Sequence, residues 1–243
     1  MFFMGNAKRR RETVASDVAR EVALIELIYR SALEREGAAE VVVLTDETTD
    51  LGALTSSLQI VRYDLRDIPL MLARLTAESR YVSEHPLDRP IVLADTDILI
   101  NRSIASLFAD DFDVAVTVRR KRTMPINSGV RLIHNRRPEV SRRFMRELAE
   151  LVGGRFLHEA NWWADQMALN AMVSIDARLR LPASVTHNGF IVRALPVGEY
   201  NYSPPAHRWA MMLPYRRKAI LHFKSARRKA LMPDFFRRHF AAD

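Results

Sequence analysis

The chain has 243 residues, of which 48% are hydrophobic and 27% are charged, so it is long enough to bury a full core in one domain. Lys and Arg number 37 against 29 Asp and Glu, which gives a formal net charge of +8. Because cysteine is absent, a disulfide framework, a thiolate metal site and a cysteine nucleophile are excluded.

The positive charge gathers in a few segments. They are Lys8–Arg11, Arg119–Arg122 and the segment that follows Pro205. Such clusters suit a polyanion, namely a nucleoside diphosphate, an anionic membrane surface or a nucleic acid. A solvated basic face is the alternative for each cluster. No apolar run is long enough to cross a bilayer, and the start MFFMGNAKRRR reverses the charge order of a signal peptide, so we expect a cytoplasmic protein.

Apolar runs alternate with helical periodicity in the first half of the chain. After a short strand at residues 2–4, Ser16 is expected to cap a helix that ends at Gly37. The apolar, β-branched run Val41–Leu44 is typical of a strand buried on both faces of a parallel sheet. The pattern then predicts a strand at 58–63, a helix from about 69 to 84 and a strand at 91–94.

The second half repeats the alternation. It predicts strands at 114–118, 129–133, 178–181 and 220–223, helices at 138–151 and 162–173, and an irregular loop at 196–214. Helices between apolar strands predict an α/β fold with a central, mostly parallel sheet flanked by helices. We expect one Rossmann-like domain over residues 1–243, with a basic carboxyl-terminal segment from about 205 to 243.

Asp95-Thr96-Asp97 follows the apolar strand predicted at 91–94. In open α/β sheets, ligands bind at the carboxyl ends of the strands. Two carboxylates separated by one residue can hold a hard cation, and Mg²⁺ and Mn²⁺ readily bridge such ligands to phosphates. The alternative is a pair of solvated aspartates that cap the next turn.

Two further polar segments suit a sugar. Asn127 and Ser128 supply donors and acceptors for hydroxyl groups, and Gly129 lets the backbone approach a ligand, although an ordinary turn into a strand explains them equally well. Asp165 and Gln166 follow Trp162-Trp163 at a helix start. They suit hydrogen bonds to a sugar, while core tryptophans and an aspartate that complements the helix dipole are the alternative.

A late segment, Ile220–Lys224, places His222 at the end of a short apolar strand. An imidazole there can ligate a metal, and the basic side chains up to Lys229 can neutralise a departing diphosphate. The alternatives are a hydrogen-bonded core histidine and a solvated basic face.

Taken in order, these segments resemble the GT-A nucleotide-sugar glycosyltransferases, and glycosyltransferase family 8 in particular. That family has a strand ending in DxD, an N-[AS]-G-[VI] turn, a DQ pair followed by Leu-Asn, an L-P…N segment and a late H-[FY]-x-G-x-x-K. The matching segments are Asp95–Asp97, Asn127–Val130, Asp165-Gln166 with Leu169-Asn170, Leu181-Pro182 with Asn188, and His222-Phe223. The resemblance extends from the first predicted strand to about residue 230.

The resemblance implies a metal-dependent transfer of a sugar, with retention, from a nucleoside diphosphate sugar to an acceptor hydroxyl in glycan or surface polysaccharide synthesis. Asp95, Asp97 and His222 would bind Mn²⁺ or Mg²⁺. Asn127, Asp165 and Gln166 would act at the donor sugar or the anomeric carbon. The remaining expected substrate contacts are Gly5, Asn6, Lys8, Asp46, Arg80 (or Arg74), Asp95, Thr96, Ser128, Gly129, Lys224 and Arg228. The expected partners are a UDP-sugar, a saccharide or lipid-linked acceptor and an anionic membrane touched peripherally.

The sequence departs from the family where Ser225 replaces a glycine and Arg228-Lys229-Ala230 replaces Lys-Pro-Trp. One competing interpretation is a phosphatase of the haloacid-dehalogenase type, but those enzymes carry DxD on the first strand. The other is a basic module for nucleic acid or membrane. No nucleic-acid-binding motif accompanies the charge, so no nucleic-acid partner is expected.

Overall fold

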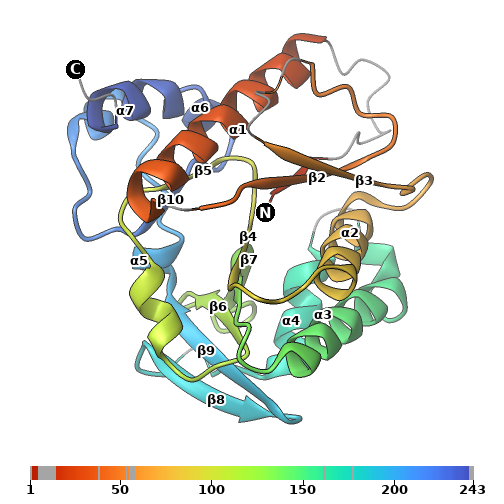
Figure 1. Cartoon of the computed structure of the whole chain (residues 1–243). Coiled ribbons are helices and arrows are strands. Elements are labelled where there is room, and N and C mark those ends of the chain that lie inside the picture. The colour runs from red at the N-terminus through yellow and green to blue at the C-terminus, as the bar shows by residue number, and fades with distance from the viewer. Residues whose placement is uncertain are drawn as a thin grey trace.

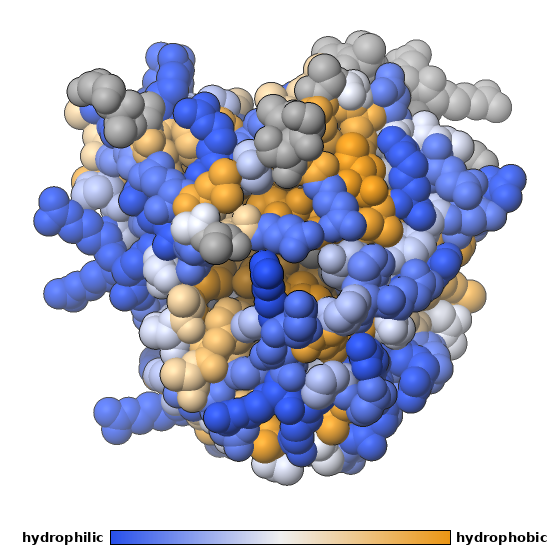
Figure 2. Space-filling view, viewed as in Figure 1, coloured by the Kyte–Doolittle hydropathy of each residue, from blue (hydrophilic) through white to orange (hydrophobic). Residues whose placement is uncertain are grey.

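Most of the apolar runs are strands of one sheet, which extends from β3 at the upper right of Figure 1 to β8 at the bottom. In the same view, hydrophilic side chains cover most of the surface, with apolar patches between them (Figure 2). The computed structural model describes residues 2–4, 15–37, 39–52, 54, 58–160, 163–176 and 178–240. Among these residues, eight strands pair in the order β3-β2-β1-β4-β7-β6-β9-β8. Their bounds are β1 Phe2–Met4, β2 Val42–Asp46, β3 Gln59–Tyr63, β4 Ile91–Ala94, β6 Val114–Val118, β7 Ile126–Ile133, β8 Ala183–His187 and β9 Phe190–Pro196.

The sheet is parallel in one half and mixed in the other. Strands β3, β2, β1 and β4 run parallel to one another. Strand β7 is antiparallel to both β4 and β6, while β9 is parallel to β6 and β8 is antiparallel to β9. Because β4 and β6 therefore point the same way, their carboxyl ends lie at the same edge of the sheet.

Helices cover both faces, as the α/β pattern predicts. Helices α2 (Leu70–Glu84), α3 (Pro138–Gly153) and α4 (Ala164–Val173) pack in one hydrophobic cluster against one face. Helices α1 (Ala15–Glu36) and α7 (Met232–His239) pack on the other, over a two-stranded sheet of β5 (Ile98–Ile100) and β10 (Ile220–His222) (Figure 1). The expected fold class is confirmed.

Side chains alternate between these two layers along the strands. Leu93 joins the α2–α4 layer and Ala94 the α1–α7 layer, and Ile133 and Leu132 divide in the same way. This is the two-residue period of a strand buried on both faces. It explains why the strands appear in the sequence as continuous apolar runs.

Three predicted elements differ from the structure. Residues 178–180 form a turn in which the Arg178 and Leu179 amides bond Asp176, and the strand is β8, which begins after Pro182. Strand β7 begins at Ile126, so Asn127–Gly129 lies inside a strand rather than in a turn before it. The predicted loop at 196–214 contains helix α5 (Val197–Tyr200) and the 3₁₀ helix η3 (Arg208–Met212). Strands β5 and β9 were not predicted.

The remaining short helices are α6 (Ala226–Lys229), η1 (Ala105–Ala109) and η2 (Leu157–Glu159). No helix in the described part of the chain combines the length and the apolar character that a membrane span requires.

Candidate active site

The site begins where β4 ends. Asp95 is the first residue after β4, and its backbone amide donates to the Gly129 carbonyl of β7 at 3.0 Å. Strand β5 begins at Ile98, and its antiparallel pairing with β10 sets Ile98 opposite His222. The Phe223 amide fixes the same crossing by donating to the Asp97 carbonyl at 2.8 Å. Two distant segments of the chain therefore meet at the end of β4.

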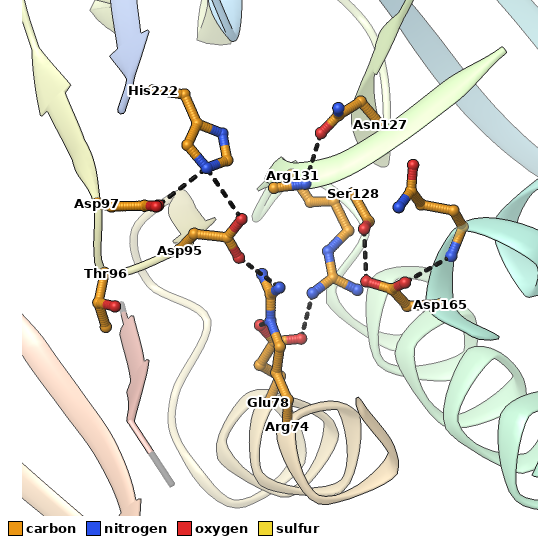
Figure 3. A network of polar contacts seen from close by, with 12 residues as sticks. Arg74, Glu78, Asp95, Thr96, Asp97, Asn127, Ser128, Arg131, Asp165 and His222 are labelled. Carbon is orange, nitrogen blue, oxygen red and sulfur yellow. Dashed lines mark hydrogen bonds and ion pairs between the residues drawn. The ribbon is translucent and has the colours of Figure 1, made fainter. Parts of the chain in front are cut away.

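Asp95, Asp97 and His222 form a compact cluster, as Figure 3 shows. His222 Nε2 lies 2.9 Å from Asp97 Oδ1 and 3.2 Å from Asp95 Oδ2. Burial lowers the pKa of His222, but the two carboxylates outweigh it and raise that pKa. Burial likewise raises the pKa of Asp95, while Arg74 and His222 hold it well below its usual range. An ionised Asp95 and a cationic His222 ring are thus favoured when no other cation is present.

These three residues fit a divalent cation. One ligand atom from each lies within 4.8 Å of the others, and two carboxylate oxygens with one imidazole nitrogen suit Mn²⁺ or Mg²⁺. Gly129 forms one wall of the cluster, because a Cβ atom there would lie 2.5 Å from His222 Cε1 and 2.7 Å from Asp95 Oδ2. Glycine is required here by a close approach of side chains and not by a positive φ.

A chain of buried ion pairs holds Asp95 from the α2 side. Arg74 Nη1 lies 2.5 Å from Asp95 Oδ1, and Arg74 Nε donates to Glu78 at 3.0 Å. Glu78 also accepts from Arg131 of β7, which is completely buried. Figure 3 shows the two arginines on either side of Glu78. Arg74 and Arg131 thus both pair with the buried Glu78 carboxylate, and Arg74 forms a second ion pair with Asp95.

Asp165 and Gln166 begin helix α4 beside β7. Both are buried, and Ser128 Oγ donates to Asp165 Oδ2, while the other oxygen accepts from the Gln166 amide at 2.7 Å. Gln166 Oε1 accepts from Arg119 Nη2 at 3.1 Å. Trp163, just before the helix, is 43% exposed and is not a core residue. Trp162 lies outside the described residues.

Asn127 helps to orient His222 through Asn201, a residue that the sequence did not indicate. Its Oδ1 accepts from Asn201 Nδ2 at 2.9 Å and from the Gly129 amide at 3.1 Å. Asn201 Oδ1 lies 2.7 Å from His222 Nδ1. The amide pair therefore orients the ring so that Nε2 faces the two aspartates.

A shift in strand register makes room for these contacts. Between β6 and β7 the pairing passes from Val116 opposite Arg131 to Thr117 opposite Asn127, so that Ser128–Val130 has no partner in β6. Such irregularities re-aim side chains near functional sites. Here the Ser128 hydroxyl is directed to Asp165, and Gly129 lies against the metal-ligand cluster.

The segment after β10 brings positive charge to the cluster. Lys229 Nζ lies 2.9 Å from Glu21 of α1 and 3.7 Å from Asp97 Oδ2, and Glu21 also accepts from Thr96 Oγ1 at 3.1 Å. Arg228 bonds the carbonyls of Pro204 and Lys224, at 2.7 and 3.3 Å.

Lys224 and Ser225 have unusual environments in the same segment. Burial lowers the pKa of Lys224. The carboxylates of Asp95 and Asp97 offset this only in part, because the charges of Arg119 and Arg228 also oppose its protonation. Ser225 has φ 85° and ψ 151°, a conformation that is close to glycine-only. The backbone thus has a conformation that favours glycine, even though the residue is serine.

Other predicted site residues lie elsewhere. The Asp46 carboxylate accepts from Thr48 and Thr49 in the loop after β2, at 2.7 to 2.8 Å. Arg80 pairs with Glu84 and stacks on Tyr63, and Arg74 is the α2 arginine that contacts Asp95. Gly5, Asn6 and Lys8 lie outside the described residues. Asn188 of the L-P…N segment lies in the β8–β9 turn, at the sheet edge opposite Asp95.

The sequence did not single out Glu21, Glu78, Arg131 or Asn201. Only Glu78 carried a usable signal, because it stands four residues after Arg74 on a predicted helix. Arg131 lies within an apolar strand, where a buried arginine implies a buried carboxylate but does not say which one.

The fold matches that of solved glycosyltransferase structures. GlyE of Streptococcus pneumoniae TIGR4 aligns with 96% of this chain at a TM-score of 0.57 and 15% identity, and the chain covers 58% of GlyE. The galactosyltransferase LgtC, solved with donor and acceptor sugar analogues, aligns over the whole chain and 96% of its own at a TM-score of 0.57 and 13% identity. The chain has the GT-A fold.

A third match is a glycosyltransferase involved in glycosylation of the major capsid of PBCV-1, with a TM-score of 0.55, 12% identity and coverage of 96% of this chain and 98% of that one. The sequence matches no protein-family model and no curated protein. The resemblance stated from the motifs is thus confirmed at the level of the fold. The phosphatase and nucleic-acid-binding interpretations are not favoured.

Proposed function

We propose that the chain is a glycosyltransferase that moves a sugar from a nucleoside diphosphate sugar to an acceptor hydroxyl, with Mn²⁺ or Mg²⁺ bound by Asp95, Asp97 and His222. One observation carries the proposal. A buried cluster of two carboxylates and an imidazole lies at the carboxyl edge of the GT-A sheet, next to cations suited to a diphosphate.

The charge distribution supports such a transfer. When the anomeric C–O bond breaks, negative charge develops on the departing nucleoside diphosphate, and its stabilisation is the main catalytic demand. Lys224 and Arg228 lie next to the aspartates without a carboxylate ion pair among the described residues, and so are available to it. A bound divalent cation would add Lewis acidity at the same diphosphate.

Asp165 and Gln166 suit the sugar. The Ser128 and Gln166 contacts hold the Asp165 carboxylate in one orientation, in which it can accept hydrogen bonds from sugar hydroxyls. In a single-step transfer with retention, the acceptor oxygen bonds the anomeric carbon on the face from which the diphosphate leaves, as the bond to the diphosphate breaks. A phosphate oxygen would then take the acceptor's proton. Among the structural matches, one is described as an active-site mutant of LgtC in which glutamine is replaced by glutamate, which makes Gln166 the residue to test first.

A nucleotide-sugar screen tests the proposal. UDP-, GDP- and dTDP-sugars would be assayed for thermal stabilisation and slow hydrolysis, with Mn²⁺, with Mg²⁺ and with EDTA. We expect at least one donor to stabilise and turn over only with metal, and Asp95→Asn to lose both effects. Full metal-dependent turnover by Asp95→Asn would refute the proposed site. The anomeric configuration of the product, read by NMR, tests retention.

We also propose that the carboxyl-terminal region touches an anionic membrane, where a lipid-linked acceptor would lie. A groove of about 830 Å³ between η3 and α7 is lined by Arg208, Trp209, Met211, Met212, Asp234, Arg237 and Arg238. Trp209 and Met212 are about 60% exposed, and arginines around exposed aromatic and apolar groups suit an anionic lipid interface. Failure to sediment with liposomes of anionic phospholipid at low salt would exclude this contact.

A further inference from the structure

The basic run Arg119–Arg122 has no part in the function proposed above, yet its first residue lies at the site. Arg119 directly follows β6, whose carboxyl end shares the sheet edge of Asp95. Its Nε donates to the Met124 carbonyl at 2.9 Å, and its Nη2 donates to Gln166 Oε1 at 3.1 Å. These two bonds fix the guanidinium beside Gln166.

Both acceptors of Arg119 are neutral. In the described part of the chain no carboxylate forms an ion pair with Arg119, and Nη1 has no hydrogen-bond partner. Burial lowers its pKa, with no counteracting carboxylate. By contrast, Arg74 and Arg137 each face a carboxylate oxygen at 2.5 Å. A partly buried guanidinium without a counter-ion is unfavourable unless a ligand supplies the anion.

Arg119 is near two groups of site residues. Its guanidinium contacts Gln166, which is adjacent to Asp165. It is also close enough to Lys224 for the two positive charges to interact unfavourably. Under the proposed function, on which this step rests, the diphosphate would lie on the Lys224 side and the two reacting sugars on the Gln166 side.

We propose that Arg119 forms an anion subsite at the sugar end of the active site, and that it binds a carboxylate or phosphate group carried by one of the two reacting sugars. A guanidinium fork matches the planar oxygens of a carboxylate and the oxygens of a phosphate. Gln166 holds the fork in place, so the subsite is built before the ligand arrives. The anion belongs either to the transferred sugar, as in a uronic acid, or to the acceptor.

Calorimetry with Mn²⁺ tests the first possibility, the donor arm, in which the transferred sugar carries the anion. UDP, UDP-glucose and UDP-glucuronate would be titrated into the wild type and into Arg119→Gln. We expect Arg119→Gln to weaken UDP-glucuronate by about 10- to 100-fold, as for the loss of a charge-assisted pair, and to leave UDP within about 3-fold. Arg119→Lys keeps the charge without the fork and should be intermediate.

Transfer assays with a neutral donor test the second possibility, the acceptor arm, in which the acceptor carries the anion. Acceptor saccharides with and without a carboxylate or phosphate group would be compared, and Arg119→Gln should raise KM only for the anionic ones. An effect on UDP-glucuronate assigns the anion to the donor, and an effect on acceptor KM assigns it to the acceptor.

Two matched variants complete the design. Arg120→Gln removes the same charge from the exposed neighbour and should change neither arm, whereas Arg228→Gln should weaken UDP and both UDP-sugars alike. If Arg119→Gln weakens UDP as much as UDP-glucuronate, or changes neither arm, the subsite does not exist. If the wild type binds no nucleoside diphosphate at all, the proposed function fails, and the subsite fails with it.

Discussion

The two sides of Asp95 balance their charges differently. On the α2 side, Arg74, Glu78 and Arg131 alternate in sign and are all buried. On the side of α6 and the β6–β7 turn, Arg119, Lys224 and Arg228 form no ion pair with a carboxylate among the described residues. Alternating charges that pair with one another, which we call the closed side, hold the side chains in place. Cations without a carboxylate partner can instead pair with an anionic ligand. The first side should therefore govern stability and the second side binding.

Glu78→Gln should have the largest effect of the variants, a loss of stability on the α2 side. It leaves Arg131 and Arg74 buried without the carboxylate between them, and removing one partner of a buried ion pair typically costs about 3 to 5 kcal/mol. Chemical denaturation monitored by circular dichroism measures the loss. Glu147→Gln is the matched control, because its partner Arg143 is 3.6 Å away and both side chains are exposed, so the change should stay within about 0.5 kcal/mol. Equal losses in the two variants would contradict the assignment.

Gly129→Ala tests the point where the two sides meet. The added Cβ would lie 2.5 Å from the His222 ring and 2.7 Å from Asp95 Oδ2, so the metal ligands must move. We expect Mn²⁺ affinity to fall by about 10- to 100-fold, as for disturbed ligand support, with about 1 to 3 kcal/mol lost from overpacking. Mn²⁺ titration calorimetry measures the first effect. Gly198→Ala, with open space around its Cβ position, should bind Mn²⁺ as the wild type does.

Lys224→Gln should separate binding from stability. Burial and the charges of Arg119 and Arg228 outweigh the attraction of Asp95 and Asp97 and lower the pKa of Lys224. Its charge therefore does not stabilise the fold, and the variant should unfold at the same denaturant concentration or a higher one. UDP affinity should fall by about tenfold. Lys121→Gln, exposed in the β6–β7 turn, controls for the charge change. A marked loss of stability would show that Lys224 belongs to the closed side.

Ser225→Gly should give the smallest effect and the only clear gain. A non-glycine residue at φ 85° and ψ 151° costs about 1 to 3 kcal/mol, so glycine should stabilise the fold by about 1 kcal/mol after its greater unfolded-state entropy is counted. Thermal unfolding measures the shift in Tm. A lower Tm would mean that the Ser225 hydroxyl contributes more than its backbone strain costs.

The sequence predicted the fold well where a single segment carried the information. The run Ile91–Ala94 is a strand because its residues are apolar on both faces of the sheet. The apolar run stops at Asp95, and so does the strand. Asp95, Asp97 and His222 were expected together from the family resemblance, and the structure brings them together.

Other features depended on pairing between distant segments. No local pattern marks Asn201 as the partner of His222, or Glu78 as the partner of Arg131. Strand β7 was predicted too short because Asn127-Ser128-Gly129 has turn composition. In the structure this segment stays in the sheet because Asn127 pairs with Thr117 of β6 and the Gly129 carbonyl accepts from the Asp95 amide. Residues 178–181 alternate between arginine and leucine and were predicted as a strand, but in the structure the chain turns at Asp176 and the strand begins at Ala183.

The pairing of β5 with β10 also has a consequence for the order of folding. It closes a loop of about half of the chain, so its entropic cost exceeds that of the local helices, and we expect it to form after them. During synthesis, Asp95 and Asp97 emerge long before His222. A metal ion that needs all three ligands therefore binds tightly only to a chain whose last strand has joined its sheet, and the appearance of Mn²⁺ binding during refolding would mark that event.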